Sequence, residues 1–199
     1  MATPAIGVTG SIGTGKSTFC EFLAEPGGLH LDADTIAKNL MRPGHAGYEP
    51  VIEEFGTYIT DDKGHIKPDL LAEEVFSDPG RLKTLEEILH PLVIERIQER
   101  ISRTDKNYYV IDAPLLFEAG VDRLCDWVVV VTASEDVVAE RLSTRGMTPA
   151  QVERRRKRQL SQEEKIKRAD EVVHNNASLS ELKQKAHDLS ERVRSRNFG

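Results

Sequence analysis

The apolar positions of the 199-residue chain fall into short runs that alternate with longer segments of helical periodicity. Each run is bounded by turn residues or ends in an acid, and the longest, WVVVVT, is an unbroken β-branched stretch. Runs of this kind are typical of strands buried on both faces of a parallel sheet. The pattern therefore predicts five strands, at Ala5–Val8, Leu29–Asp32, Tyr108–Asp112, Trp127–Thr132 and Asp170–His174.

The segments between these runs have helical character and end at sequence breakers. We expect a helix over Ser17–Glu25 to stop at Pro26-Gly27-Gly28, and a second helix over Ala33–Met41 to stop at Arg42-Pro43-Gly44. In the C-terminal half, Ser134 is a good N-cap for a helix that continues to Arg145. A helix pair and a closing helix are expected at residues 149–169 and 178–194.

The segment from Tyr48 to Arg103 is predicted to be helical almost throughout. Turns are signalled at residues 61–64 and 78–80. Pro91 should kink or restart the helix that contains it. Because this helical block interrupts the alternation of strands and helices, it is the natural candidate for an inserted substrate-binding region.

Strands alternating with helices predict an α/β fold, in which a parallel sheet is covered by helices on both faces. In such sheets, ligands bind at the carboxyl ends of the strands. The loop that follows Val8, the acids Asp32 and Asp34, and Asp112 all come directly after strands. We therefore expect one shared site at this edge of the sheet.

The loop after the first strand carries a phosphate-binding motif. Gly10, Gly15, Lys16 and Ser17 fit the pattern G-x-x-x-x-G-K-[ST], which a chain of this length would contain by chance roughly once in a hundred sequences. We expect Gly10, Gly13 and Gly15 to adopt φ > 0, so that successive N–H groups surround an anion. The helix starting near Lys16 would add its positive N-terminal end.

Nucleoside triphosphate binding follows from this motif. Lys16 would contact the β and γ phosphates, and the Ser17 hydroxyl is suited to ligate Mg²⁺. The Gly-rich turn alone does not say what happens to the γ phosphate, so that answer has to come from the rest of the chain.

Two acids after strands are candidates for catalysis and metal binding. Asp34 could act as the base toward an attacking hydroxyl, or it could only cap the following helix; the upstream phosphate loop favours catalysis. Asp112 ends its strand as a Walker B acid does, which would place it at Mg²⁺. A turn-initiating role before Ala113-Pro114 is nearly as good an interpretation.

Positive charge is concentrated in the C-terminal third. Arg141 and Arg145, four residues apart on one helix face, are the better candidates for a lid that closes over the nucleotide. Most members of the run Arg154–Arg158 should face solvent, with acids nearby for surface pairing. His90 is a lone histidine, and such residues are more often structural than catalytic.

Composition limits the class of protein. Hydrophobic residues make up 39% and charged residues 30%, as in soluble globular proteins, and the net charge of -6 argues against a surface that binds nucleic acid. The sequence contains neither a long apolar stretch nor a leader pattern, which predicts a cytoplasmic protein with no membrane partner. Cys20 and Cys125 do not form a C-x-x-C pair, and core packing is expected for both.

Six segments together resemble the dephospho-CoA kinase family, whose members phosphorylate the ribose 3′-hydroxyl of dephospho-coenzyme A with ATP. They are TGSIGTGKST at residues 9–18, DADTIAK at 32–38, RPG at 42–44, LHP at 89–91, PLLFE at 114–118 and AD-x-V-x-x-NN ending at Asn176. The segments run in the family's order over almost the whole chain. The DAD, HP and PLLFE elements separate this family from other P-loop kinases.

The resemblance implies roles for individual residues. Asp34 would be the base toward the 3′-hydroxyl, with Lys16 and Arg141 as the other catalytic residues, and Ser17 and Asp112 would bind Mg²⁺. The implied ATP-binding set is Ser11, Ile12, Gly13, Thr14, Gly15, Lys16, Ser17, Thr18, Arg145 and Asn175, with Asn175 near adenine. The implied acceptor set is Asp34, His90, Pro91, Leu115 and Glu118. This chain departs from the family pattern at Pro68, where Arg is usual, and at Ala177, where Gly is usual.

The resemblance also implies one P-loop kinase domain over residues 1–199, with a nucleoside-kinase-like core at 1–40, 107–140 and 170–199. A helical acceptor-binding region at 42–104 and a lid at 141–168 would complete it. We expect dephospho-CoA as the small-molecule partner, and a monomer or weak homo-oligomer. The alternatives are another small-molecule P-loop kinase, acting on a nucleoside monophosphate or a sugar-type alcohol, and an NTP-driven switch protein.

Overall fold

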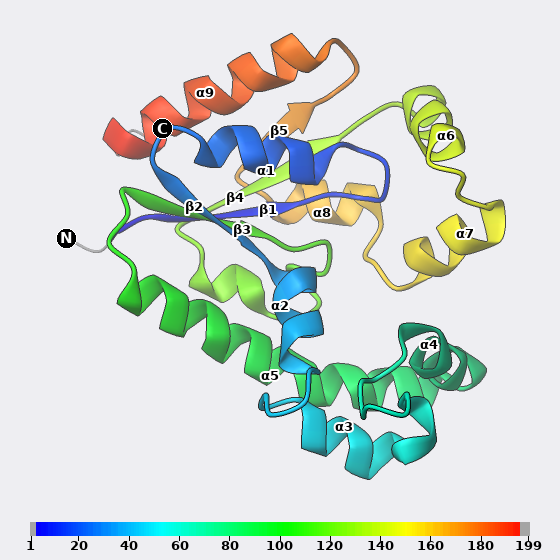
Figure 1. Cartoon of the computed structure of the whole chain (residues 1–199). Coiled ribbons are helices and arrows are strands. Elements are labelled where there is room, and N and C mark those ends of the chain that lie inside the picture. The colour runs from blue at the N-terminus through cyan, green and yellow to red at the C-terminus, as the bar shows by residue number, and fades with distance from the viewer. Residues whose placement is uncertain (1–2, 196–199) are drawn as a thin grey trace. The chain divides into compact units, whose positions relative to one another are not determined.

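The computed structural model describes residues 3–195, which group into two compact units (Figure 1). The first unit contains the described residues up to Asp32 and from Thr104 onward, and the second contains Ala33–Arg103. Each unit is described by itself. Over residues 3–195, every helix is too short or too polar to cross a membrane.

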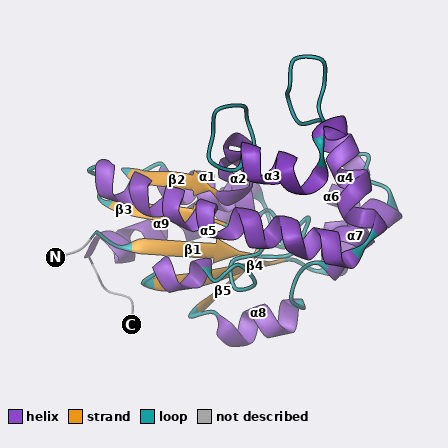
Figure 2. Cartoon of the chain, turned by 90° about the horizontal axis from the view of Figure 1, so that it is seen from below, coloured by secondary structure: helices purple, strands orange, loops and turns teal. Residues whose placement is uncertain are grey.

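The first unit is built on a parallel sheet of five strands within the described residues, as the sequence predicts (Figure 2). The spatial order is β2-β3-β1-β4-β5, so β1 lies in the centre with β3 on one side and β4 on the other. The strands are β1 (Ala5–Thr9), β2 (Gly28–Asp32), β3 (Tyr108–Asp112), β4 (Trp127–Thr132) and β5 (Glu171–His174).

Three strand boundaries differ from the expectation by one residue, since β1 extends to Thr9, β2 begins at Gly28 and β5 begins at Glu171. Gly28, predicted to belong to a helix-stopping turn, begins β2. The turn covers residues 25–27, and Gly27 within it has φ of 101°. At Gly28 a Cβ atom would lie 2.5 Å from the Tyr108 ring. The absence of a side chain at this position therefore lets the ring pack directly on the strand.

The strand register brings acids to a common edge. Val8 pairs with Asp112 across β1 and β3, and Asp32 pairs with Asp112 across β2 and β3. The carboxyl ends of these three strands therefore lie next to each other, and the loop that follows β1 starts at the same edge. The shared edge that the sequence predicts is confirmed for the loop, Asp32 and Asp112.

Helices α1 (Lys16–Ala24) and α9 (Leu179–Ser195) pack side by side on one face of the sheet (Figure 1). Their apolar faces and the strands form one core, in which Ile6, Phe19, Cys20 and Leu189 are at most 1% exposed. The core position expected for Cys20 is confirmed. Cys125 is half-buried and packs on β1, where a Cβ atom at Gly7 would lie 2.6 Å from its Sγ.

The remaining helices of this unit are α6 (Glu135–Thr144), α7 (Pro149–Lys157), α8 (Gln162–Arg168) and the 3₁₀ turn η2 (Val121–Leu124). The expected helix pair is confirmed, and α7 begins with a capping box between Thr148 and Gln151. Ser134 precedes α6 as expected, but over the described chain its hydroxyl forms no capping bond. Its backbone N–H instead donates to Asn176 Oδ1 at 2.7 Å, which ties α6 to the loop after β5.

The second unit is helical, with its own apolar core. It contains α2 (Ala33–Leu40), α3 (Tyr48–Phe55), η1 (Thr57–Ile59), α4 (Pro68–Ser77) and α5 (Pro79–Arg103). The expected break at residues 78–80 is confirmed, because Asp78 is extended and α5 starts at the next residue. The core residues are Val51, Phe55, Ile59, Leu71, Val75 and Leu89.

The turn expected at residues 61–64 is confirmed, but the non-helical segment around it is longer than expected. Apart from η1, residues 56–67 are not helical and contain an isolated β-bridge between Thr60 and Ile66. The Asp61 carboxylate accepts the N–H groups of Lys63 and His65, both at 2.9 Å, and Gly64 has φ of 80°. Asp and Gly at these places favour the turn over a helix.

Helix α5 does not restart at Pro91, although the sequence allowed for this. A single helix runs from Pro79 to Arg103 with Pro91 inside it. Proline in a helix removes one backbone hydrogen bond and crowds the preceding turn. Here the Pro91 side chain is exposed, and Leu89, Val93 and Ile97, spaced along one face, are buried and hold the helix on both sides of the proline.

Candidate functional site

The loop between β1 and α1 has the backbone that phosphate binding requires. Gly13 and Gly15 adopt φ of 85° and 87°, as the motif predicts. Gly10 does not have a positive φ, so that part of the expectation was wrong. Glycine is needed there for space, because a Cβ atom would lie 2.5 Å from the Val131 carbonyl oxygen and 2.9 Å from Thr14 Oγ1.

The same loop is braced from within the first unit. The Thr14 hydroxyl, 2% exposed, donates to the Ser11 carbonyl at 2.9 Å. The buried Asn175 amide donates from Nδ2 to the Thr14 carbonyl at 2.7 Å. A Cβ atom at Gly15 would overlap that amide. The Ser11 and Thr14 carbonyls are thus both held by hydrogen bonds, and the N–H groups of the same two residues donate to Gln162 Oε1 and to the Ser11 carbonyl.

Arg141 reaches this loop from α6. Its guanidinium donates to the Thr14 carbonyl at 3.3 Å and to the Asn175 carbonyl at 3.2 Å. Arg145, which ends α6, is exposed. The structure therefore places Arg141 beside the phosphate loop. Its expected contact with phosphate stays a prediction.

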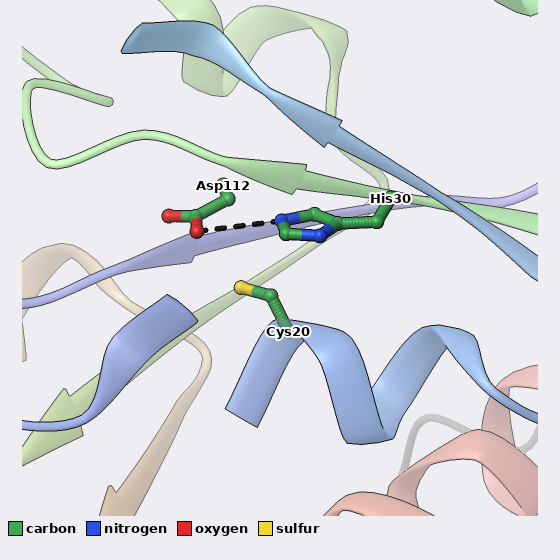
Figure 3. A group of neighbouring side chains, drawn as sticks. All are labelled: Cys20, His30 and Asp112. Carbon is green, nitrogen blue, oxygen red and sulfur yellow. Dashed lines mark hydrogen bonds and ion pairs between the residues drawn. The ribbon is translucent and has the colours of Figure 1, made fainter. Parts of the chain in front are cut away.

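Lys16 and Asp112 form an ion pair between the loop and the end of β3. The Asp112 side chain is 1% exposed, and its second oxygen lies 3.4 Å from His30 Nε2 (Figure 3). Burial lowers the pKa of His30, and the nearby Asp32 and Glu21 carboxylates oppose that shift. Asp112 is thus held in place by a cation on one oxygen and an imidazole on the other.

The segment after β3 and helix α8 form a second polar cluster. The Lys165 side chain is fully buried, and Nζ donates to the Pro114 carbonyl at 2.7 Å and to Gln159 Oε1 at 3.1 Å. Glu118 lies 3.9 Å from Nζ and accepts the Leu160 N–H at 2.6 Å. Because burial disfavours the charged amine, the pKa of Lys165 falls to about 8, although Glu118 partly opposes the shift.

This buried amine predicts a pH dependence of stability. The folded-state pKa of about 8 lies below the ordinary value of 10.5, so between these pH values the unfolded chain binds more protons at Lys165. The penalty for burying the charge is present below pH 8 and is relieved as pH rises. Relative to Lys165→Met, the wild type should gain about 1.4 kcal/mol of unfolding free energy per pH unit within this range.

Denaturant unfolding of both proteins from pH 7 to pH 10 checks this expectation. The comparison cancels other titrating groups, including the Cys20 thiol, whose pKa burial raises to about 12. A difference in unfolding free energy that stays constant with pH would contradict it.

Two pockets in the described part of the first unit adjoin the phosphate loop and α6. One, of about 400 Å³, is lined by loop residues together with α7 and the start of α8. The other, of about 380 Å³, lies between α6 and the loop after β5, lined by Val137, Glu140, Arg141, Thr144, Arg145, Asn176 and Ala177.

The structure brings together most of the nucleotide and metal residues that the sequence predicts. Residues 11–18 form the loop and the start of α1, with Asp112, Arg141 and Asn175 against or beside them. Leu115 and Glu118 follow β3 in the same unit. Asp34 is exposed in the first turn of α2, and His90 and Pro91 lie within α5, all in the second unit.

Sequence reasoning missed three polar residues of this region. They are His30 beside Asp112, Lys165 beneath Pro114, and Gln162, whose Oε1 accepts the Ser11 hydroxyl at 2.6 Å. The alternation of β2 could have placed His30 on the same face as Asp32, two residues on. Neither Lys165 nor Gln162 stands out in a segment where charged and polar residues follow each other.

A family model and curated relatives of this chain carry the same family name. A family model described as dephospho-CoA kinase matches residues 4–181. The dephospho-CoA kinase of Aquifex aeolicus is 41% identical over 179 residues, which cover 88% of this chain and 90% of that protein. The crystal structure of TT1252 from Thermus thermophilus has a TM-score of 0.81 at 33% identity, covering 96% of this chain and 98% of that one. The dephospho-CoA kinase from Campylobacter jejuni has a TM-score of 0.71 at 27% identity, covering 99% and 100%.

Proposed function

Since the chain belongs to the dephospho-CoA kinase family, we propose that it transfers the γ-phosphoryl group of ATP to the ribose 3′-hydroxyl of dephospho-coenzyme A. The products are coenzyme A and ADP, and the place of action is the cytoplasm. The observation that carries the proposal is the phosphate loop, with Gly13 and Gly15 left-handed and Lys16 paired to the buried Asp112.

The ion pair suggests how the loop responds to ATP. With ATP bound, Lys16 moves from Asp112 to the β and γ phosphates, which carry more negative charge than one carboxylate. The N–H groups of the loop and the N-terminus of α1 bind the same phosphates. Arg141, already beside the loop, would then donate to phosphate oxygens.

We assign adenine to the pocket between α6 and the loop after β5. This pocket of about 380 Å³ is lined by Arg141 and Arg145 on one side and by Asn176 and Ala177 on the other. Guanidinium groups stack well on flat aromatic rings. Asn175 contributes by holding the Thr14 carbonyl, and its neighbours line the pocket.

The donors present suit Mg²⁺. The Ser17 hydroxyl is exposed in the first turn of α1, and Asp112 offers a carboxylate at the adjacent strand end. Both supply the oxygen ligands that this ion prefers. Bound there, Mg²⁺ would neutralise charge on the transferring phosphoryl group. Asp112 becomes available to it as Lys16 turns to the phosphates.

For the acceptor, we assign Asp34 as the base that accepts the proton of the 3′-hydroxyl. It is an exposed carboxylate two residues after β2 ends. His90, Pro91, Leu115 and Glu118 complete the acceptor set on the strength of the family motifs. Nucleic acid and membranes are not expected partners, and the enzyme is proposed to act as a monomer or weak homo-oligomer.

An acceptor screen tests the proposed function. Purified protein with Mg²⁺ and ATP is given dephospho-CoA, a nucleoside monophosphate or a sugar-type alcohol, and ADP release is measured together with the phosphorylated product. We expect turnover only with dephospho-CoA, giving coenzyme A. Preference for another acceptor would favour a different small-molecule kinase. Slow hydrolysis indifferent to every alcohol, with tightly retained ADP, would favour a switch protein.

A further inference from the structure

Three side chains with metal-binding atoms meet on the face of the sheet that α1 covers (Figure 3). His30 pairs in register with Val110, so Asp112, two residues further along β3, lies on the same face as His30. Helix α1 packs on β2 and β3 and brings Cys20 to them. The thiol sulfur, an imidazole nitrogen and a carboxylate oxygen all lie within 4.8 Å of one another.

The distances between these ligand atoms suit a cation with tetrahedral coordination. Ligands at about 2.0–2.2 Å from Zn²⁺ stand about 3.4 Å apart in a tetrahedron. His30 Nε2 and Asp112 Oδ2 lie at that separation, 3.4 Å. Zn–S bonds of about 2.3 Å are slightly longer, and the Cys20 sulfur lies within 4.8 Å of both of the other ligand atoms.

Of the three side chains, only that of His30 is accessible to solvent to any extent. Cys20 is fully buried and Asp112 is 1% exposed, whereas the His30 side chain is 25% exposed. A cation can enter beside the imidazole and keep a water molecule as its fourth ligand. Three protein ligands with one open position is a common arrangement of zinc sites that exchange ligands.

We propose that Cys20, His30 and Asp112 form a binding site for one thiophilic divalent cation, represented by Zn²⁺, and that the bound cation lowers the kinase activity. The second clause rests on the proposed function, because it assumes that Asp112 serves Mg²⁺ during phosphoryl transfer. The first clause concerns binding alone and can be tested without turnover.

The chemistry of the ligands separates the two cations. Mg²⁺ prefers oxygen ligands, so the thiol and the imidazole do not attract it, whereas Zn²⁺ binds sulfur and nitrogen readily. A thiolate and a carboxylate together neutralise a divalent charge. Because burial keeps the Cys20 thiol protonated, the cation has to displace that proton, which selects for metals that bind thiolate strongly.

Asp112 links this site to the nucleotide. Its carboxylate already pairs with Lys16, and a thiophilic cation on its other oxygen would add a second positive charge close to Lys16 and to the proposed Mg²⁺ position. Repulsion between these charges, and the withdrawal of Asp112 from Mg²⁺, both oppose binding of the Mg²⁺–ATP complex.

Spectroscopic titration with Co²⁺ tests binding in the full chain freed of metal by a chelator. Co²⁺ bound to thiolate gives a charge-transfer absorption in the near ultraviolet, and we expect it to saturate at one equivalent. Cys20→Ser should abolish the band, and His30→Gln should weaken binding by more than roughly 100-fold, since loss of an outer-shell partner alone costs about 10–100-fold. Cys125→Ser removes the other cysteine of the sequence and should keep the band.

The absence of a thiolate band in the wild type, or a band that survives Cys20→Ser, would overturn the site. Circular dichroism of each variant shows whether the fold is kept. Because the His30 side chain is partly exposed, His30→Gln should keep the fold, and its Co²⁺ affinity can be measured even if Cys20→Ser is unstable.

Kinase assays at fixed Mg²⁺–ATP test the second clause. Zn²⁺ should inhibit the wild type, and a chelator selective for Zn²⁺ over Mg²⁺ should reverse the inhibition. Cys20→Ser, outside the proposed nucleotide-binding set, should keep its turnover without added Zn²⁺ and need at least 10-fold more Zn²⁺ for half inhibition. Equal inhibition of both proteins would overturn the clause. A Zn²⁺-free wild type that turns over no dephospho-CoA with Mg²⁺–ATP would instead count against the proposed function, and the Co²⁺ result would stand by itself.

Discussion

Asp34→Asn should lower the turnover number by a factor on the order of 10²–10⁴ and leave ATP affinity nearly unchanged. A general base contributes about this much to a proton transfer, and the asparagine amide, which has the same shape, cannot accept the proton. If Asp34 only interacted with the N-terminus of α2, its loss would cost about 0.3–1 kcal/mol of stability and little turnover. The measurements are steady-state turnover with dephospho-CoA and calorimetric binding of ATP.

Asp69→Asn is the matched control. Asp69 is also an exposed acid in the first turn of a helix of the second unit, α4. It should show the small change in stability and normal turnover. If the two variants behave alike, or if Asp34→Asn loses turnover and ATP affinity to the same extent, Asp34 is not the base.

Lys16→Met should affect catalysis and stability together. The loss of a charged group aimed at the transferring phosphoryl group lowers the turnover number by about 10²–10³. The variant also leaves the Asp112 carboxylate, 1% exposed, without its cation, and breaking a buried pair in this way costs about 3–5 kcal/mol. Turnover assays and denaturant unfolding measure the two effects.

The double variant Lys16→Met/Asp112→Asn separates the loss of stability from the loss of activity. It removes the buried Asp112 charge that Lys16→Met leaves unpaired, but it does not restore the contact with phosphate. It should recover much of the lost stability and none of the activity. Lys83→Met, which breaks the exposed pair with Glu87, should change the unfolding free energy by less than about 1 kcal/mol. A Lys16→Met protein as stable as the wild type would show that the ion pair with Asp112 contributes nothing to the fold.

Local features of the sequence predicted most of the fold. Apolar runs, Gly and Pro breakers and capping residues each act within a few positions, so the strands and most helix ends could be predicted without knowing their neighbours. Asp61 and Gly64 signalled the turn between α3 and α4 in the same way, and it forms with its own hydrogen bonds. The expectation failed at Gly10, where the sequence shows a glycine but cannot distinguish a positive φ from a lack of space.

By itself, the sequence determined the five strands, the phosphate loop and the edge at which Asp32 and Asp112 lie, because hydrophobic periodicity and the spacing of the loop motif are properties of short segments. Only the tertiary structure decided that His30 faces Asp112, that Lys165 is buried under Pro114, and that Arg141 donates to the Thr14 carbonyl of the loop. These contacts join residues 51 to 127 positions apart. They depend on strand order and on packing between elements, and neither can be predicted from a local sequence pattern.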